Sequence, residues 1–519
     1  MCRVENPRNN NMKLEDLPEH LIHHIMHFLP YKEAAKFSVL SIAFYSSWLS
    51  FPTLKFTYKA TLSKGVSYHT FFHSVQKTLK LRGPHIKGSL HKLSLSYMEI
   101  VRPNSQHHRK VFDVLLNFAL QNNVKEINFD ISNDIGNLSY YDSLLPLFSS
   151  QFLTVLKLSG IKNILFCDAS ITCPELKELV IHHCDAFQTI NVSSSSLKKV
   201  EVICCKGLKA VQLLEGKSIH SFKFEGFKTH ACDINIPSCD SLRYLHLTNV
   251  EISENICNKV VPQVEFLHLV CCNMPKNLRL HNPHVKVLKL KRNRKLENIV
   301  LSTPNLERFS YEEASETRHC RLDISECLAL RVLKLVRATT ITDGWLKRTI
   351  WVLLCLKKLD IRECNRLTGI EFENDSLEKF SLYECSQLKE VNVDVSNLLE
   401  FCYSGSLQVY PMFILSAKCN GNIKLPSGRS DLDSVKQFLG CFDHFKDLTI
   451  SCSRAEFKYG NEVESKNMKV EECCYDVPIK CWRHYEVKIE IQGLDESVRQ
   501  CLENFFATSL CYYGIYRHG

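Results

Sequence analysis

A short pattern of apolar and polar positions recurs along this chain. Each copy has a large apolar residue, two variable positions, an apolar residue, one variable position and a further apolar residue, as in SLRYLHL from Ser241 to Leu247. The alternating end of a copy is typical of a short strand that buries one face. Successive copies lie 21 to 26 residues apart, and their first apolar positions are Leu153, Leu176, Leu197, Ile219, Leu242, Val264, Val285, Leu306, Leu330, Leu356, Leu377 and Leu398.

A steady period of about 22 residues indicates stacked units, because one such unit cannot bury its apolar face alone. The pattern resembles the leucine-rich repeat. Many copies carry a second apolar stretch rich in β-branched residues, such as the stretch with Leu367, Ile370 and Phe372. We expect short strands there, on the convex side, and few long helices. The resemblance implies an α+β repeat protein: a horseshoe-shaped solenoid with parallel strands on its concave face.

Helical spacing replaces the repeat pattern between Lys13 and Ser50. One predicted helical face carries Leu17, Leu21, Ile25, Phe28 and Leu29. Asp16 and Pro18 favour a helix start, and Pro30 favours its end. The next helical pattern carries Ala34, Phe37, Leu40, Phe44 and Trp48. A unit of about 40 residues is small for a self-supporting core, so the pattern predicts a binding partner.

These helical residues resemble the F-box of plant proteins. The matching features are Leu17-Pro18, the ridge of Leu21, Ile25 and Leu29, Pro30, the run Ser38–Ser41, and Trp48 followed by Phe51–Leu54. An F-box followed by repeats resembles the plant F-box/LRR-repeat family. Such proteins usually have a basic residue and a tryptophan after the serine-flanked run, where this chain has Ile42, Ala43 and Phe44. Phe44 can fill the aromatic role.

The family resemblance implies a non-catalytic adaptor of an SCF-type ubiquitin ligase, without a cofactor. The F-box would bind a Skp-type linker protein and, through it, a cullin/RING core. The repeats would hold an unknown target protein for ubiquitination and proteasomal degradation. The implied linker-binding residues are Leu14, Leu17, Pro18, Leu21, Ile25, Leu29, Pro30, Leu40, Phe44 and Trp48. The alternatives are a repeat scaffold or receptor without ligase function, which the change at Ile42–Phe44 would favour, and a small-molecule co-receptor.

The expected organisation has five parts. Residues 1–12 form a disordered extension, 13–53 the F-box, 54–150 a linking and capping region with irregular first repeats, 151–425 the solenoid, and 426–519 a mixed α/β C-terminal cap. Helices are predicted at 69–81 and 109–120, where they would cap the solenoid. In the last part we expect helices at 432–442 and 497–510, strands at 445–451 and 485–493, and a charged loop at 455–472.

Composition narrows the class of protein. Hydrophobic residues make up 45% and charged residues 23% of the 519, which excludes wholesale disorder. The formal charge of +9 is modest for this length. The sequence shows neither a secretory signal nor an apolar run long enough for a membrane span. We therefore expect a cytoplasmic and/or nuclear protein, in which the 25 cysteines are free thiols rather than a disulfide framework.

Catalytic and metal-binding motifs are missing from the sequence. There is no Cys-x-x-Cys pair for zinc, no phosphate-binding glycine loop and no nucleophile elbow. Five cysteines instead occupy one recurring repeat position, three residues after the last strand position, where a small buried residue is wanted. They are Cys184, Cys205, Cys272, Cys364 and Cys385. We predict a structural role for them, and no catalytic or metal site.

The variable strand positions predict a target-binding face on the concave side. Tyr244, His246, Phe266 and His268 form an aromatic and imidazole group on neighbouring repeats, and a basic group follows. Aromatic anchors beside charges are typical of protein-binding surfaces, and nucleic acid is the less favoured ligand. The remaining candidate residues are Lys289, Lys291, Arg308, Lys334, Lys358, Arg362 and Tyr383.

Overall fold

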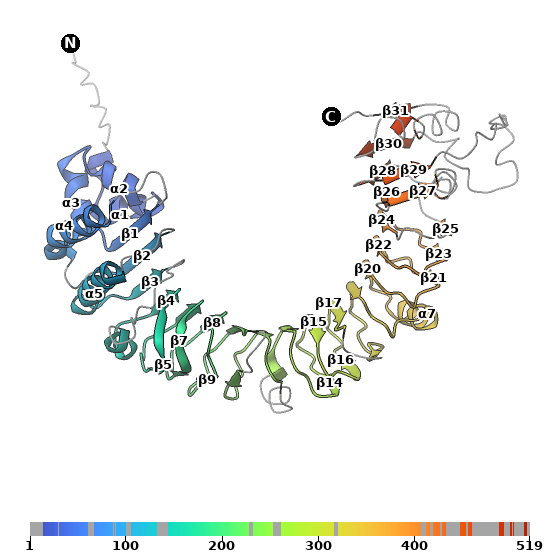
Figure 1. Ribbon diagram of the computed structural model, residues 1–519, viewed down its shortest axis with the longest axis horizontal. Coiled ribbons are helices and arrows are strands. Elements are labelled where there is room, and N and C mark those ends of the chain that lie inside the picture. Colours follow the sequence, from blue (N-terminus) through green and yellow to red (C-terminus); the bar gives the residue numbers. More distant parts are fainter. Residues whose placement is uncertain are drawn as a thin grey trace, which may run out of the picture. The chain divides into compact units, whose positions relative to one another are not determined.

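The computed structural model describes residues 14–29, 31–60, 67–86, 88, 90–99, 105–131, 144–227, 232–252, 261–315, 320–405, 412–415, 419–425, 428–431, 438, 447–452, 455–458, 487–492, 499–500, 502 and 513–515. They fall into two compact units, residues 1–242 and 243–519, called unit 1 and unit 2. Each unit contains a main sheet of parallel strands and a second set of outer strands (Figure 1). The predicted disordered extension, residues 1–12, lies outside the described residues.

Unit 1 begins with four short helical segments: η1 (Leu14–Asp16), α1 (Glu19–Phe28), α2 (Tyr31–Phe37) and α3 (Ile42–Ser50). The Ser41 hydroxyl caps α3 by accepting a hydrogen bond from the backbone N–H of Phe44 at 3.2 Å. Ile22, Met26, Ala34, Phe44 and Phe51 form the buried core of these helices. The segment thus has a small apolar centre of its own.

The predicted apolar face of α1 is not the side that forms the core of these helices. Ile22 and Met26 are buried, whereas Leu21 is exposed and 73% of the Phe28 side chain is accessible to solvent. The predicted face through Leu21 and Phe28 therefore lies largely at the surface, beside the buried stripe. Apolar residues surround most of α1, and its contacts with α2 and α3 bury the stripe through Ile22 and Met26.

The main sheet of unit 1 is parallel and follows the repeat pattern. Its strands, in spatial order, are β1 (Thr53–Ala60), β2 (Lys92–Glu99), β3 (Glu126–Asp130), β4 (Val155–Ser159), β6 (Glu178–His182), β8 (Lys199–Ile203) and β10 (Ser221–Glu225). Leu156, Leu179 and Val200 stand in register on adjacent strands and are fully buried. Stacking neighbours thus complete the core that one repeat lacks.

The return segments of unit 1 change character along the chain. After β1 and β2 they are the helices α4 (Tyr68–Ile86) and α5 (Ser105–Gln121), at the two positions where helices were predicted. A 3-10 turn, η2 (Leu145–Ser149), precedes β4. Later return segments contain the parallel outer strands β5 (Lys162–Ile171), β7 (Asp185–Val192), β9 (Ala210–Leu213) and β11 (Asp233–Asn235). Strands on this side agree with the β-branched second stretches of the repeats.

Unit 2 continues the same architecture. Its main sheet contains, in spatial order, β12 (Tyr244–Thr248), β13 (Phe266–Val270), β15 (Val287–Asn293), β17 (Arg308–Glu313), β19 (Val332–Val336), β20 (Lys358–Arg362), β22 (Lys379–Tyr383), β24 (Glu400–Ser404), β26 (Asn420–Leu425), β28 (Asp447–Cys452), β30 (Val487–Gln492) and β31 (Tyr513–Ile515). All these pairings are parallel, so the ladder extends into the predicted C-terminal cap region.

In the described part of the outer side of unit 2, the ten-residue helix α7 stands among short strands. The outer elements are η4 (Val261–Gln263), β14 (Asn277–His281), β16 (Asn298–Ser302), β18 (Arg321–Asp323), α7 (Asp343–Val352), β21 (Gly369–Glu373), β23 (Glu390–Asp394), β25 (Met412–Leu415), β27 (Gly428–Asp431) and β29 (Ala455–Lys458). β29 stands where the charged loop was predicted to begin, and it pairs with β27. The predicted helices at 432–442 and 497–510 lie largely outside the described residues.

One tight turn recurs at the ends of main-sheet strands. Its first residue has a positive φ, between 50° and 54° at His183, Cys204, Cys271, Glu363 and Glu384. The next residue is the recurring cysteine, whose thiol donates to the carbonyl two residues earlier at 3.3 to 3.6 Å. Four of these cysteines are buried and Cys385 is half-buried. The predicted structural role of the five cysteines is confirmed.

Candidate functional site

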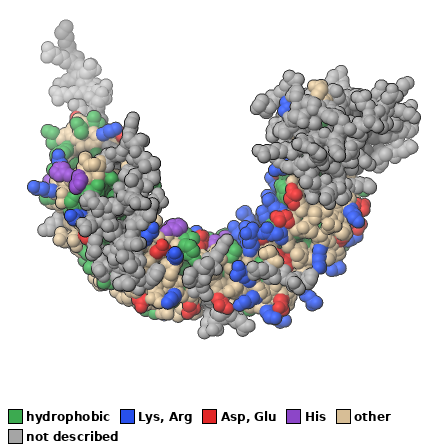
Figure 2. Space-filling model, in the orientation of Figure 1, with side chains coloured by type: hydrophobic (Ala, Val, Ile, Leu, Met, Phe, Trp, Pro, Cys, Tyr) green, Lys and Arg blue, Asp and Glu red, His purple; other side chains and the backbone are tan. Residues whose placement is uncertain are grey.

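Exposed apolar side chains gather on the helices at the start of unit 1 (Figure 2). Val39 and Leu40 in the turn that joins α2 to α3, and Ile42 at the start of α3, are highly accessible, at 84%, 71% and 89%. Leu14, Leu21 and Phe28 of η1 and α1 are also exposed. Exposed large apolar groups of this density mark interaction sites on monomeric proteins. The arrangement can bind an apolar surface of another protein.

The predicted linker-binding residues divide into two groups. Leu14, Pro18, Leu21 and Leu40 are exposed and available to a partner. Leu17, Ile25, Leu29 and Trp48 are half-buried, and Pro30 lies outside the described residues. Phe44 is buried, with its ring 4.2 Å from that of Phe37 in a stacked arrangement. Phe44 thus contributes to the core that presents the exposed group.

Sequence reasoning did not identify Arg82, which connects these helices to the first repeats. Arg82 lies on α4 and is fully buried. Its guanidinium donates to the carbonyls of Leu49, Phe51 and Thr53, which lie between the end of α3 and the start of β1. It also lies over the Trp48 ring, 4.9 Å from the centroid. The pattern of apolar residues along α4 does not indicate this role. The hydrogen-bond partners of Arg82 are backbone carbonyls, which any sequence provides.

The structure places all eleven predicted target-binding residues on the main sheet of unit 2. They occupy positions between the buried ones, a surface called here the main-sheet face. Register pairs Tyr244 with Phe266, and His246 with His268. The rings of Tyr244 and His246 lie 5.6 and 5.5 Å from that of His268. The predicted aromatic and imidazole group is therefore a contiguous cluster.

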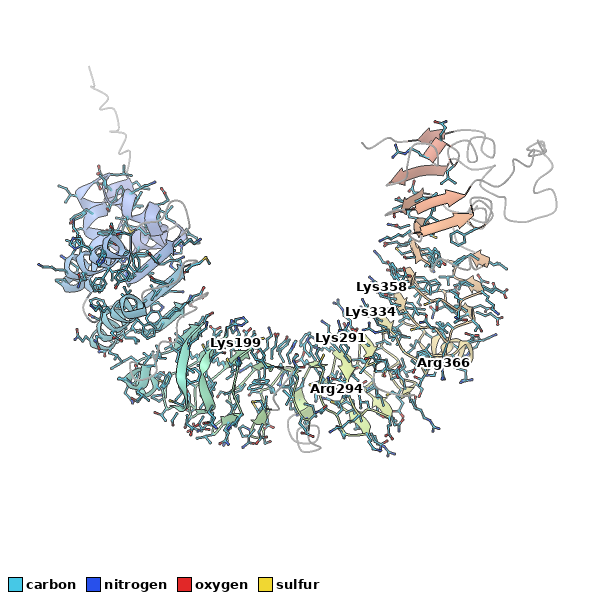
Figure 3. The ribbon with its side chains drawn as sticks, viewed as in Figure 1. Lys199, Lys291, Arg294, Lys334, Lys358 and Arg366 are labelled. Carbon is cyan, nitrogen blue, oxygen red and sulfur yellow. The ribbon has the colours of Figure 1, made fainter. Side chains whose placement is uncertain are left out.

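Basic side chains follow this cluster along the main-sheet face. Figure 3 shows Lys291, Lys334 and Lys358 projecting from β15, β19 and β20 on one side of unit 2. Arg362 lies 4.3 Å from the Tyr383 ring centroid and donates two hydrogen bonds to Asp360, at 2.7 and 2.9 Å. Tyr383 and Arg362 thus form a separate group from the aromatic cluster on β12 and β13.

Comparison with known proteins identifies the helices at the start of unit 1. Residues 14–56 match the F-box domain. Three curated proteins of Arabidopsis thaliana are similar over longer stretches. One, named as an F-box/FBD/LRR-repeat protein, is 24% identical over 286 residues, covering 50% of this chain and 54% of the relative. The chain therefore carries an F-box domain and is similar to plant F-box/LRR-repeat proteins.

The two other relatives carry F-box/LRR-repeat names. One is 24% identical over 274 residues, which is 49% of this chain and 55% of the relative. The other is 23% identical over 212 residues, which is 37% and 42% respectively. The chain thus aligns with about half the length of the curated relatives it matches. The exposed apolar group described above lies within the matched F-box.

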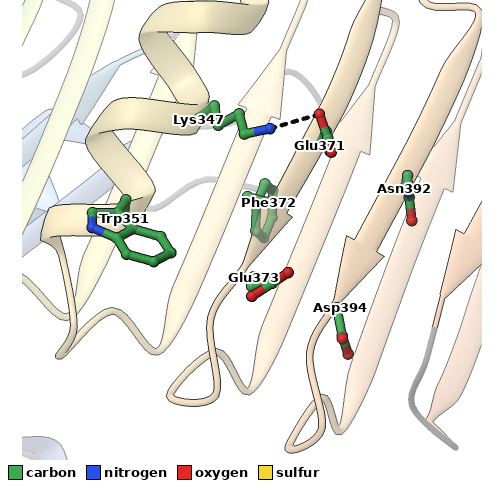
Figure 4. A pocket seen from close by; sticks show the side chains of 7 residues that line it. All are labelled: Lys347, Trp351, Glu371, Phe372, Glu373, Asn392 and Asp394. Atoms are coloured by element: carbon green, nitrogen blue, oxygen red, sulfur yellow. Dashed lines mark hydrogen bonds and ion pairs between the residues drawn. The ribbon is translucent and has the colours of Figure 1, made fainter.

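A groove on the outer side of unit 2 adjoins α7 (Figure 4). Lys347 and Trp351 of α7 line it together with Glu371 and Phe372 of β21 and Asn392 of β23. The Lys347 ammonium lies 2.8 Å from the Glu371 carboxylate. Trp351 is 71% exposed. The groove is open and carries a charge pair beside an aromatic ring, on the opposite side of the repeats from the main-sheet face.

The described part of this chain offers no cluster of three or more His, Cys, Asp and Glu side chains that could hold a metal ion. A search of the described helices also found none with both the length and the apolar character of a membrane span.

The structure predicts a sharp contrast in thiol reactivity. Burial raises the pKa of Cys205 and of Cys364 to about 12, whereas Cys355 is exposed. The thiolate is the reactive form, so Cys205 and Cys364 should react with iodoacetamide more than about a hundredfold more slowly than Cys355. Peptide mass spectrometry of the native chain measures the rates, and the denatured chain is the control. Equal native rates would contradict the assigned burial.

Proposed function

We propose that this chain is a substrate-recognition adaptor of an SCF-type ubiquitin ligase. Its F-box binds a Skp-type linker protein and thereby a cullin/RING core, and its main-sheet face binds a target protein. The observation that carries the proposal is the exposed apolar group of Leu40 and Ile42 inside the matched F-box. An apolar surface of this kind on so small a helical unit is stabilised when a partner covers it.

The proposed adaptor supplies no catalytic group of its own. It acts by proximity, because holding the target near the charged ubiquitin carrier raises its effective concentration. Ubiquitin transfer and subsequent proteasomal degradation depend on other subunits. The place of action in this proposal is the cytoplasm and/or the nucleus.

The double variant L40D/I42D should lose linker binding. Both side chains are exposed, so the change should leave the fold intact while placing two carboxylates in an apolar contact. Affinity for a purified Skp-type linker should fall by about a hundredfold or more, as measured by calorimetry or pull-down.

The matched control is L214D/L399D, which places the same charges at two exposed leucines outside the F-box. It should bind the linker as the unchanged protein does. Unaltered linker binding in L40D/I42D would refute the adaptor assignment and favour a repeat scaffold or receptor without ligase function.

A further inference from the structure

On strands β4, β6, β8 and β10, the main-sheet face of unit 1 compensates its own charges. Neighbouring strands there carry alternating lysines and glutamates whose ion pairs form a continuous chain. The N···O distances are 3.1 Å for Lys157–Glu178, 3.0 Å for Lys199–Glu178, 3.4 Å for Lys199–Glu201, 3.4 Å for Lys223–Glu201 and 3.0 Å for Lys223–Glu225. The hydrogen bond to Glu178 raises the pKa of Lys199, as expected for a satisfied pair. These four strands, β4 to β10, have little charge left to attract a ligand.

The corresponding face of unit 2 has an excess of cations. Across β13 to β20, cations stand at six positions between the buried residues and carboxylates at only two, Glu312 and Asp360. The six cations are Lys289, Lys291, Arg308, Lys334, Lys358 and Arg362. This stretch, from Phe266 to Arg362, is called here the basic face.

Both carboxylates of the basic face are already engaged. Glu312 is held by Arg292, at 2.5 Å, and by Arg337, which stand beside the face. Asp360 is buried and accepts both hydrogen bonds from Arg362, with Lys334 3.5 Å away. Neither carboxylate therefore neutralises the remaining cations.

Four cations of the basic face have no ion pair with any described residue: Lys289, Lys291, Arg308 and Lys358. Lys291 stands in register with Glu312, which Arg292 and Arg337 already hold. For two others, strand register itself gives the reason. Lys289 stands between His268 and Ser310, and Arg308 between Val287 and Val332, so their neighbours across the sheet are neutral. Lys289 and Lys291 are also half-buried, which makes an uncompensated charge more costly than at an open surface.

An apolar contact point adjoins the free cations. Phe266, on the strand next to β15, is 38% exposed. Beside it, burial and the neighbouring Lys289 lower the pKa of His268 to about 4, so the ring is neutral near pH 7. Its Nε2 atom is buried and has no hydrogen-bond partner among the described residues. One end of the basic face therefore offers an exposed aromatic ring beside an uncharged imidazole.

We propose that the basic face binds an extended acidic segment of the target protein, rich in Asp and Glu. The carboxylates would lie over Lys289, Lys291, Arg308 and Lys358, and an apolar side chain of the segment would contact Phe266. Adjacent strands lie about 4.8 Å apart, so the four steps from β13 to β20 span about 19 Å, the length of roughly six extended residues. This inference rests on the proposed function, because it names the class of target that the adaptor holds.

Charge complementarity favours a protein segment over other polyanions. Three of the four free cations are lysines, which bind carboxylates as point charges, whereas phosphate recognition favours the planar fork of arginine. The excess on the basic face does not continue onto β4 to β10, where the charges are compensated. A continuous basic track of the kind that follows a nucleic-acid backbone is therefore not present on the described part of the main-sheet faces.

The test is direct binding of a fluorescent peptide to the full chain. The probe is a ten-residue peptide with one phenylalanine and alternating glutamates, and its partner probe carries glutamine in place of each glutamate. Anisotropy should show binding of the acidic probe only, weakening as salt rises. The variant K289E/K291E should lower affinity by about tenfold or more. The milder variant K289Q/K291Q should lower the affinity for the acidic probe less. Circular dichroism checks that both variants remain folded.

The matched control is R279E/R321E, which reverses two exposed cations on the outer strands β14 and β18 of the same repeats. It should keep the affinity of the unchanged chain. Equal affinity of both probes, equal loss in both charge-reversal variants, or no binding of the acidic probe would overturn the proposal. An oligonucleotide or phosphatidylserine vesicle that binds more tightly and is lost in K289E/K291E would also overturn it. Linker binding is measured separately and tests the adaptor role. The adaptor proposal and the acidic-segment proposal can therefore fail independently of each other.

Discussion

Replacing Arg82 by alanine should destabilise unit 1 by about 3 to 5 kcal/mol. The guanidinium is fully buried and donates to three backbone carbonyls, those of Leu49, Phe51 and Thr53. Alanine would leave these oxygens buried without their donors and would remove the contact with the Trp48 ring. Since the carbonyls lie where the F-box passes into β1, the F-box should separate from the repeats before the repeats unfold.

Urea unfolding with limited proteolysis measures this effect. Cleavage between residues 50 and 53 should appear at lower urea in R82A than in the unchanged chain. Lysine at this position keeps the positive charge but lacks the planar guanidinium with its several N–H donors. The stability of R82K should therefore lie between that of R82A and that of the unchanged chain. The control is K80A, an exposed residue on the same helix. If R82A unfolded like K80A, the buried hydrogen bonds would carry no net stability.

The repeat architecture could be predicted from the sequence because it depends on periodicity. Each strand buries alternate residues, so the positions of Leu156, Leu179 and Val200 follow from the pattern alone. The recurring cysteines were also predictable, since one turn geometry repeats with one small buried residue. The same logic failed on α1, where apolar residues on several sides leave the buried face to be selected by contacts with α2 and α3.

The positions of the candidate site residues could be predicted from the sequence, but their ion pairing could not. Alternation places Lys199 and Lys289 on equivalent sides of their strands, and the sequence treats them alike. Lys199 is paired with Glu178, and Lys289 has only neutral neighbours across the sheet. This difference depends on which residues stand in register on adjacent strands, over gaps of about 22 residues. Register and side-chain reach decide which lysines are free, and neither can be read from one repeat.

Replacing Phe380 by alanine should cost about 3 to 5 kcal/mol, mainly in the repeats around β22. Phe380 is fully buried, and its ring lies 5.6 Å from those of both Phe372 and Phe401. Phe401 in turn lies 5.4 Å from Phe413, so the rings form a ladder through consecutive repeats. Alanine would leave a cavity in the middle of this ladder.

The expected damage is local, because each repeat contacts only its neighbours. Hydrogen exchange should accelerate in β20 to β26, while β12 to β17 keep the protection of the unchanged chain, and thermal unfolding should broaden. The smaller truncation F380L is the control, and it should cost less than F380A because it leaves a smaller cavity. A uniform rise in exchange across unit 2 would show instead that its repeats unfold as one cooperative body. The basic face on β13 to β20 would then depend on distant repeats for its shape.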